Sequence, residues 1–107
     1  MHGWHGRILL VDLQEGQSSV LTLPREVYHS FIGGKGLAGY LLKDKMHLDW
    51  DDPEMSLVLM TGPLVNTRAP TSGRMCVMSR SPLTGTIADS SVGGSFAGSL
   101  KKAGWDG

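Results

Sequence analysis

The stretch from Gly62 to Gly94 limits the fold most strongly, because it places Gly, Pro, Ser and Thr at the ends of short apolar runs. Its segments GPLVNTRAPTSGR, RSPLTG and SSVGGSF predict turns between short strands. The glycines also allow the main chain to approach a ligand closely, and Arg74 supplies a cation just after one loop. This pattern is typical either of ordinary turns or of loops that hold a polar anionic ligand through main-chain groups.

The rest of the pattern predicts an α+β fold, a small mixed or antiparallel sheet with two to three helices. Residues 7–13 and 18–23 flank the turn sequence QEGQ and predict a hairpin. Further strands are expected over 56–60, 74–78 and 86–90. Helices are expected over 25–32, from about Gly36, and over 95–103 with Phe96 and Leu100 on the buried side. Helices in blocks, without a regular βαβ alternation, favour this class.

The composition of the chain argues against nucleic-acid binding and against membrane association. The chain has 107 residues, 40% of them hydrophobic, which suffices for one small domain with a modest core. Its formal net charge is +0 and the basic residues are dispersed, so we expect no nucleic-acid partner and no membrane surface. A single cysteine cannot form an internal disulfide, and no apolar run is long enough to span a bilayer. We therefore expect a soluble, cytoplasmic protein.

One glycine pattern imitates a nucleotide motif. GKGLAG at residues 34–39 matches GxGxxG, but the residues before it, VYHSFIG, predict the end of a helix rather than a strand. We interpret it as a tight joint between two helices, at which Gly36 and Gly39 permit close packing.

Other polar residues are better explained structurally. His2 and His5 have the spacing HxxH, but Gly3 and Gly6 disfavour a helix and no third metal ligand is near, so we expect a mobile end. The acidic residues at 49–52 lack the pattern of a calcium loop and predict a solvated turn. Cys76, in an alternating strand, is expected to pack as a small hydrophobe. No Ser/His/Asp set has interpretable spacing.

Five segments in order resemble the N-terminal part of the tungsten-containing aldehyde ferredoxin oxidoreductase family. They are WHGRILLVDL (4–13), FIGGKGLAGYLL (31–42), TGPLVNTRAPTSGR (61–74), SPLTG (81–85) and SSVGGSFAGSLKKAGWDG (91–107). Family enzymes are several times longer. The resemblance implies that residues 1–107 are an incomplete N-terminal segment of a base domain beneath a bis-pterin tungsten site. It also implies that a [4Fe–4S] cluster is ligated outside this segment.

The resemblance assigns cofactor-binding residues and no catalytic residue. In the family, the arginine that closes the APTSGR-like motif lies between pterin and cluster, and Arg74 falls on that position. Family members commonly have an asparagine where Ser91 stands, whose carbonyl helps to hold a magnesium ion bridging the pterin phosphates. The resemblance thus implies that Ser91 is a metal ligand. It also implies a cofactor-binding segment made of Ser91, Val92, Gly93 and Gly94. GPLVNT departs from the family's GPLTGT, and this departure puts a ligand role of that first loop in doubt.

The implied function is an anaerobic oxidoreductase that converts aldehyde to carboxylate with a tungsten or molybdenum pterin. Electron transfer to ferredoxin or a related carrier is implied as well. We expect the 107 residues to be inactive alone and to have the remainder of the enzyme as their first partner, and a homodimer is compatible with the family. Two alternatives remain open: a non-catalytic pterin-binding or scaffold subunit without the redox domains, and a structural domain with decayed sites.

Overall fold

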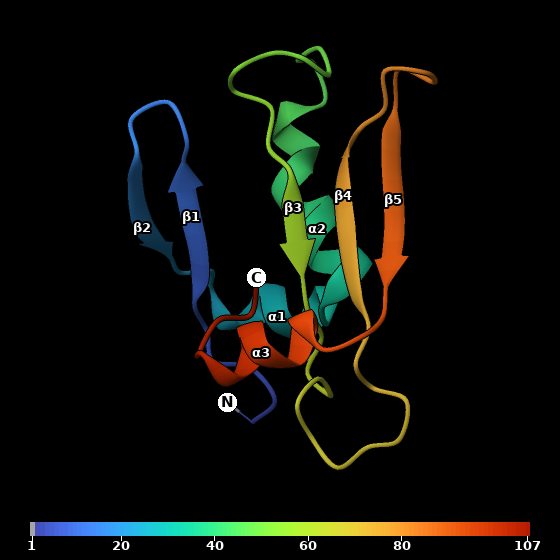
Figure 1. Cartoon of the computed structure of the whole chain (residues 1–107). Coiled ribbons are helices and arrows are strands. Elements are labelled where there is room, and N and C mark those ends of the chain that lie inside the picture. The colour runs from blue at the N-terminus through green and yellow to red at the C-terminus, as the bar shows by residue number, and fades with distance from the viewer. Residues whose placement is uncertain (1) are drawn as a thin grey trace.

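Five strands form two separate antiparallel sheets in the computed structural model, which describes residues 2–107 (Figure 1). Strands β1 (Ile8–Asp12) and β2 (Gln17–Leu21) form the expected hairpin. Strands β3 (Val58–Met60), β4 (Met75–Arg80) and β5 (Ile87–Val92) form the second sheet in the order β3-β4-β5. The residues on both sides of QEGQ pair because their β-branched and leucine side chains favour extended backbone.

Three α-helices complete the α+β fold that the sequence predicts: α1 (Arg25–Phe31), α2 (Gly34–Leu42) and α3 (Phe96–Lys102), with a short 3₁₀ turn, η1 (Lys43–Lys45), after α2. Figure 1 shows α2 behind the β3-β4-β5 sheet and α1 and α3 at the lower end of the strands. No helix among residues 2–107 is long and apolar enough to cross a membrane.

The main hydrophobic cluster lies between α2 and the β3-β4-β5 sheet. On α2, Leu37, Ala38 and Leu42 occupy one helical face and are fully buried. On β4, Cys76 and Met78 are two residues apart and therefore point to the same face of the sheet. Cys76 is buried, which confirms that it packs as a small hydrophobe. The other buried members of the cluster are Ile8, Tyr28, Val58 and Met60.

A second, smaller cluster covers the opposite face of β4 and corrects the expectation for α3. It consists of Val65, Met75 and Ala97. The buried residues of α3 are Ala97 and Lys101, one turn apart, whereas Phe96 is 55% exposed. The expectation that Phe96 faces the core was wrong, because the neighbouring helical face carries the contacts with the sheet and with the N-terminal segment.

The two ends of the described chain are joined through Asp106. Its carboxylate accepts hydrogen bonds from the main-chain N–H groups of His5 (2.9 Å) and Gly6 (2.8 Å). It also pairs with Lys101, whose Nζ lies 3.1 Å from Oδ1. The ring of His5 makes a further 2.8 Å hydrogen bond with the Lys101 carbonyl. His5 thus belongs to an anchored segment and not to the mobile end that the HxxH spacing suggests. No group of three or more potential His, Cys, Asp or Glu ligands clusters within residues 2–107.

Candidate functional site

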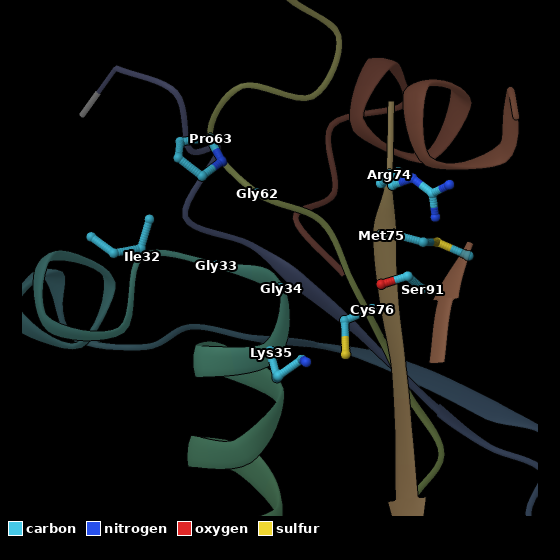
Figure 2. Close-up of a pocket in the computed structure, with 10 residues that line it drawn as sticks. All are labelled: Ile32, Gly33, Gly34, Lys35, Gly62, Pro63, Arg74, Met75, Cys76 and Ser91. Atoms are coloured by element: carbon cyan, nitrogen blue, oxygen red, sulfur yellow. The ribbon is translucent and has the colours of Figure 1, made fainter. Parts of the chain in front are cut away.

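A pocket of about 310 Å³ lies where the joint between α1 and α2 faces the start of β4 (Figure 2). It brings together three segments far apart in the sequence: the helix joint, the loop after β3, and the paired strands β4 and β5. The lining residues are Ile32, Gly33, Gly34, Lys35, Gly62, Pro63, Arg74, Met75, Cys76 and Ser91.

One wall of this pocket is bare main chain. A Cβ on Gly33 would lie 2.7 Å from the Gly62 Cα and 2.8 Å from the Thr61 carbonyl oxygen, so only glycine fits. The N–H of Gly34 donates a 2.9 Å hydrogen bond to the same Thr61 oxygen. The helix joint and the loop after β3 therefore meet backbone to backbone, which leaves peptide groups, rather than side chains, at the surface of the pocket.

Ile32 holds this joint in an unusual conformation. Its φ of 69° and ψ of −66°, with a 2.8 Å hydrogen bond from the Gly33 N–H to the Phe31 carbonyl, define a γ-turn of the rare positive-φ type. A β-branched residue is strained in this region. The indole Nε1 of Trp4 donates a 2.6 Å hydrogen bond to the Ile32 carbonyl and so holds the turn from outside. Strained backbone of this kind tends to occur at functional sites.

The opposite wall is formed by one face of β4 and β5. Ser91 is directly opposite Cys76, and Asp89 is directly opposite Met78, so the four side chains share the face toward α2. Lys35 reaches from the first turn of α2 to Asp89, with 2.8 Å between Nζ and Oδ2. Figure 2 shows Lys35 extending from α2 toward the Cys76 side chain on β4. Because this ion pair is largely exposed, water and dissolved ions screen it, and it contributes little to stability.

Cys76 contributes no reactive thiolate to the pocket. Burial raises the pKa of its thiol, and the negative charge of Asp89 raises the pKa further, while Lys35 lowers it by a smaller amount. The thiol therefore stays protonated at neutral pH, and a protonated thiol is neither a strong nucleophile nor a metal ligand.

Arg74 is an exposed cation at the edge of the pocket. It directly precedes β4 and also lines a neighbouring hollow of about 320 Å³ formed with loop residues that include Thr71 and Ser72. Within residues 2–107 its guanidinium makes no salt bridge and no hydrogen bond. Its donors are thus available for an anion from outside the described chain.

The structure brings two of the five proposed site residues together. Arg74 and Ser91 line the pocket, whereas Val92 packs against the second hydrophobic cluster. Gly93 and Gly94 follow β5 and are not among the lining residues. The left-handed conformation belongs to Gly94, with φ of 96°, and not to Gly93. A Cβ on Gly73 would lie 3.5 Å from the Gly94 oxygen, so the loops before β4 and after β5 are neighbours.

The sequence analysis missed the part of the pocket contributed by Gly33, Gly34 and Lys35. The nucleotide interpretation of GKGLAG fails as expected, because α1 and not a strand precedes it. Gly36 is needed at the joint, since its Cβ would lie 2.2 Å from the Phe31 oxygen, but Gly39 has open space beside it. The sequence signal that could have indicated this wall is the pair Gly33 and Gly34 directly before Lys35, at the start of a predicted helix.

The chain is similar over nearly its whole length to the N-terminal part of known oxidoreductases. Residues 8–107 match the family model described as "Aldehyde ferredoxin oxidoreductase, N-terminal domain". The chain is 43% identical over 108 residues to the tungsten-containing aldehyde ferredoxin oxidoreductase of Pyrococcus horikoshii, covering 99% of this chain and 18% of that enzyme. It is 31% identical over 112 residues to a Pyrococcus furiosus protein described as "Aliphatic sulfonate oxidoreductase, WOR-like subunit", again covering 18% of the relative.

A solved structure supports the same grouping. The active-site complex BamBC of benzoyl coenzyme A reductase, in complex with 1,5-dienoyl-CoA, superposes with a TM-score of 0.93 and 31% sequence identity. The superposition covers 98% of this chain and 16% of that chain. Residues 1–107 thus span less than a fifth of the relatives that they match.

Proposed function

Because the chain belongs to the aldehyde ferredoxin oxidoreductase family through that family's N-terminal domain, we propose that it binds part of a tungsten or molybdenum pterin cofactor in the pocket between α2 and β4. The single observation that carries this proposal is the convergence of Arg74, Ser91 and bare glycine backbone on one pocket. In this proposal the chain is the N-terminal segment of a larger base domain and acts with the remainder of the enzyme.

The chemistry of the pocket fits a large anionic cofactor. Arg74 has unused donors, and Lys35 is a second cation at the rim. The Gly33–Gly34 joint has no side chains that would keep a ligand from the backbone, while the N–H groups of both glycines are already hydrogen-bonded within the chain. Arginine binds phosphate or a pterin edge through paired N–H groups and stays cationic beside a negative cluster. Asp89 competes for Lys35, so Arg74 is the stronger candidate to hold the anion.

We assign the remaining cofactor contacts to main-chain groups. Ser91 would contribute its carbonyl oxygen to a magnesium ion between pterin phosphates, since magnesium prefers oxygen ligands. Val92, Gly93 and Gly94 would shape that loop, although they lie outside the pocket itself. When bound, the metal pterin supplies the redox chemistry, and this chain supplies binding, orientation and charge. The iron–sulfur cluster is assigned to residues outside this segment.

The substrate is assigned to other parts of the enzyme. The names of relatives that share this segment refer to aldehydes, aliphatic sulfonates and benzoyl coenzyme A. A segment common to such different reactions is better suited to hold a shared cofactor than to select a substrate. We propose the aldehyde-to-carboxylate reaction with a ferredoxin-like acceptor, because the relatives with 43% identity are named tungsten-containing aldehyde ferredoxin oxidoreductases. We also propose a cytoplasmic location, because a single cysteine fits a reducing compartment.

The test compares two arginines in the full-length enzyme. Arg74→Ala should lower tungsten and pterin content or shift the reduction potential of the neighbouring cluster, because a charge-assisted contact contributes on the order of 1.5–3 kcal/mol. Arg68→Ala is the matched control, since Arg68 is exposed on the same loop but does not line the pocket. Metal analysis, pterin extraction and a redox titration provide the measurements.

Two results would count against the proposal. Unchanged metal content, potential and turnover in Arg74→Ala would remove this residue from the site. An intact full-length protein that binds pterin but shows no redox activity would instead support the non-catalytic subunit.

A further inference from the structure

The segment before β1 contacts both loops that line the candidate pocket. Ile32, in the joint between α1 and α2, and Pro63, in the loop after β3, each line the pocket and the neighbouring hollow. Trp4 contacts the first loop, since its indole Nε1 donates a 2.6 Å hydrogen bond to the Ile32 carbonyl. Gly3 lies against the second loop, because a Cβ there would be 2.9 Å from the Pro63 Cβ. Neither Gly3 nor Trp4 lines the pocket, so both support its walls from outside.

The indole of Trp4 is held in one orientation by two rings of α1. Its centroid lies 6.0 Å from the ring of Tyr28, with 55° between the planes, and 5.6 Å from the ring of His29. Tilted aromatic pairs at such distances pack favourably. The indole is partly buried against the main hydrophobic cluster, while its N–H reaches a main-chain oxygen. An indole N–H can only donate, so the packing of the ring fixes the direction of this hydrogen bond.

The hydrogen bond from Trp4 fixes one peptide unit of the helix joint. The carbonyl of Ile32 accepts from Trp4, and the N–H of Gly33, in the same peptide unit, donates to the Phe31 carbonyl at 2.8 Å. The unit is thus held at both ends. Ile32 has a φ of 69°, which its branched Cβ disfavours. The turn therefore tends to open when one of these two hydrogen bonds is lost.

Opening of this turn would displace the pocket wall that follows it. Figure 2 shows Gly33 and Gly34 on the side of the pocket across from Arg74. Gly33 fits so closely against the Gly62 Cα that no Cβ has room between them, so a small displacement of the turn separates the two backbones. The distance between the bare backbone wall and the Arg74 guanidinium would then change. This distance sets the space for a ligand.

We propose that Trp4 is a positioning residue of the pocket. Through the Ile32 carbonyl it keeps the Gly33–Gly34 joint at the distance from Arg74 at which the anionic cofactor fits, although it does not line the pocket. This inference rests on the proposed binding of that cofactor between α2 and β4. The simpler alternative is that Trp4 only fills space beside Tyr28. The two roles differ in whether the indole N–H is needed.

Amide hydrogen exchange in the full-length protein tests the effect of Trp4 on the joint. Trp4→Phe keeps an aromatic ring beside Tyr28 but removes the N–H donor. Exchange at the Gly33 and Gly34 amides should become about three- to tenfold faster, which is the effect of one lost neutral hydrogen bond. The Met78 amide, in the central strand β4, is the internal reference and should keep its rate. Unchanged exchange at both glycines, or an equal acceleration at Met78, would overturn the proposal.

Cofactor content separates positioning from packing. Tungsten and pterin per protein should fall about three- to tenfold in Trp4→Phe when the cofactor is limiting during assembly. Trp50→Phe is the matched control, because Trp50 is exposed and lines neither the pocket nor the neighbouring hollow, and it should keep the wild-type content. Full content in Trp4→Phe, together with faster exchange at the joint, would show that Trp4 stabilises the turn without positioning the ligand.

A second substitution at Ile32 supplies a rescue that a packing role does not predict. Glycine adopts a positive φ without steric cost, so Ile32→Gly should make the turn independent of the hydrogen bond from Trp4. Trp4→Phe in the Ile32→Gly background should therefore change cofactor content by less than about twofold. Ile32→Ala retains a Cβ and should leave the loss in Trp4→Phe at its full size. Equal losses in the two backgrounds would contradict the proposal.

The outcome is distinguishable from that of the Arg74 test. If Arg74→Ala lowers cofactor content and Trp4→Phe does not, the proposed site stands and the positioning role of Trp4 fails. If Arg74→Ala has no effect, the cofactor lies elsewhere and both proposals fail, whatever the exchange rates at the joint.

Discussion

The Nζ of Lys101 lies 3.1 Å from Oδ1 of Asp106, and the side chains of both residues are at most 5% exposed. A buried ion pair is stable only when hydrogen bonds satisfy the remaining polar atoms. Here Asp106 also accepts the N–H groups of His5 and Gly6, and Lys101 donates to the Gly62 carbonyl at 2.9 Å. The pair therefore links α3, the N-terminal segment and a loop of the candidate site.

Removing one charge of this pair should destabilise the protein strongly. Asp106→Asn leaves the Lys101 ammonium buried without its counter-ion, and we expect the free energy of unfolding to fall by about 3 kcal/mol or more. Denaturant unfolding measures the change. Lys102→Ala is the control, because Lys102 is exposed beside Lys101 and its loss should cost less than about 0.5 kcal/mol. Equal stabilities of Asp106→Asn and the control would contradict the role of the pair.

Tyr28 should cause the free energy of unfolding to fall as the pH rises into the alkaline range. Burial, and secondly the negative charge of Asp106, raise the pKa of Tyr28 well above its ordinary value of 10.0. Its hydroxyl has no hydrogen-bond partner of good geometry within residues 2–107. We attribute the effect of Asp106 to its charge rather than to a hydrogen bond, because other donors already occupy both carboxylate oxygens.

The pKa of Tyr28 is higher in the folded protein than in the unfolded chain. As the pH rises, the tyrosine therefore loses its proton first in the unfolded state, which lowers the free energy of unfolding. The contribution of Tyr28 is thus complete below about pH 10 and decreases above it, by up to about 1.4 kcal/mol per pH unit. Unfolding should be measured for the wild type and Tyr28→Phe from about pH 9 to pH 11. The stability of the wild type should decline more steeply. Parallel pH profiles would show that Tyr28 ionises equally in both states.

Substitutions of Ser91, near the end of β5, and of Gly93, in the loop that follows, test main-chain recognition of the cofactor. Ser91→Ala should retain the cofactor, because the alanine carbonyl is equivalent as a ligand. A Cβ on Gly93 would meet nothing within 4 Å, so Gly93→Val should fold normally and lose cofactor only if the ligand approaches there. Pterin and metal content, measured beside thermal stability in the full-length enzyme, separate the cases. Full occupancy in Gly93→Val would place the cofactor elsewhere.

The strain at Ile32 predicts a stabilising substitution. Ile32→Gly relieves the positive φ, and after the entropy cost of glycine we expect a gain of about 1 kcal/mol in the free energy of unfolding. Leu57→Gly is the control, because Leu57 is exposed and has no positive φ, so it should only lose stability. A loss in Ile32→Gly as large as in the control would show that the turn stores no strain.

Local sequence patterns predicted the elements better than their contacts. The hairpin around QEGQ and the alternating strand at Cys76 depend on neighbours close in sequence, and the structure confirms them. The buried face of α3 could not be predicted, because the Lys101 side chain is buried against Asp106 and against the Gly62 carbonyl, which lies 39 positions away in the sequence. In the same way, the loop motifs predicted Arg74 and Ser91, but the Gly33–Lys35 wall depends on a tertiary contact with Gly62.

The link between Asp106 and the main chain of His5 and Gly6 also bears on how the chain folds during synthesis. The bonded residues are 101 and 100 positions apart, so the N-terminal segment leaves the ribosome long before its partner exists. Until Asp106 emerges, β1 has only the adjacent β2 to pair with, and an isolated hairpin is marginally stable in water. The earliest of the five described strands is therefore among the last to be secured, and until then its apolar edge can contact chaperones and other nascent chains.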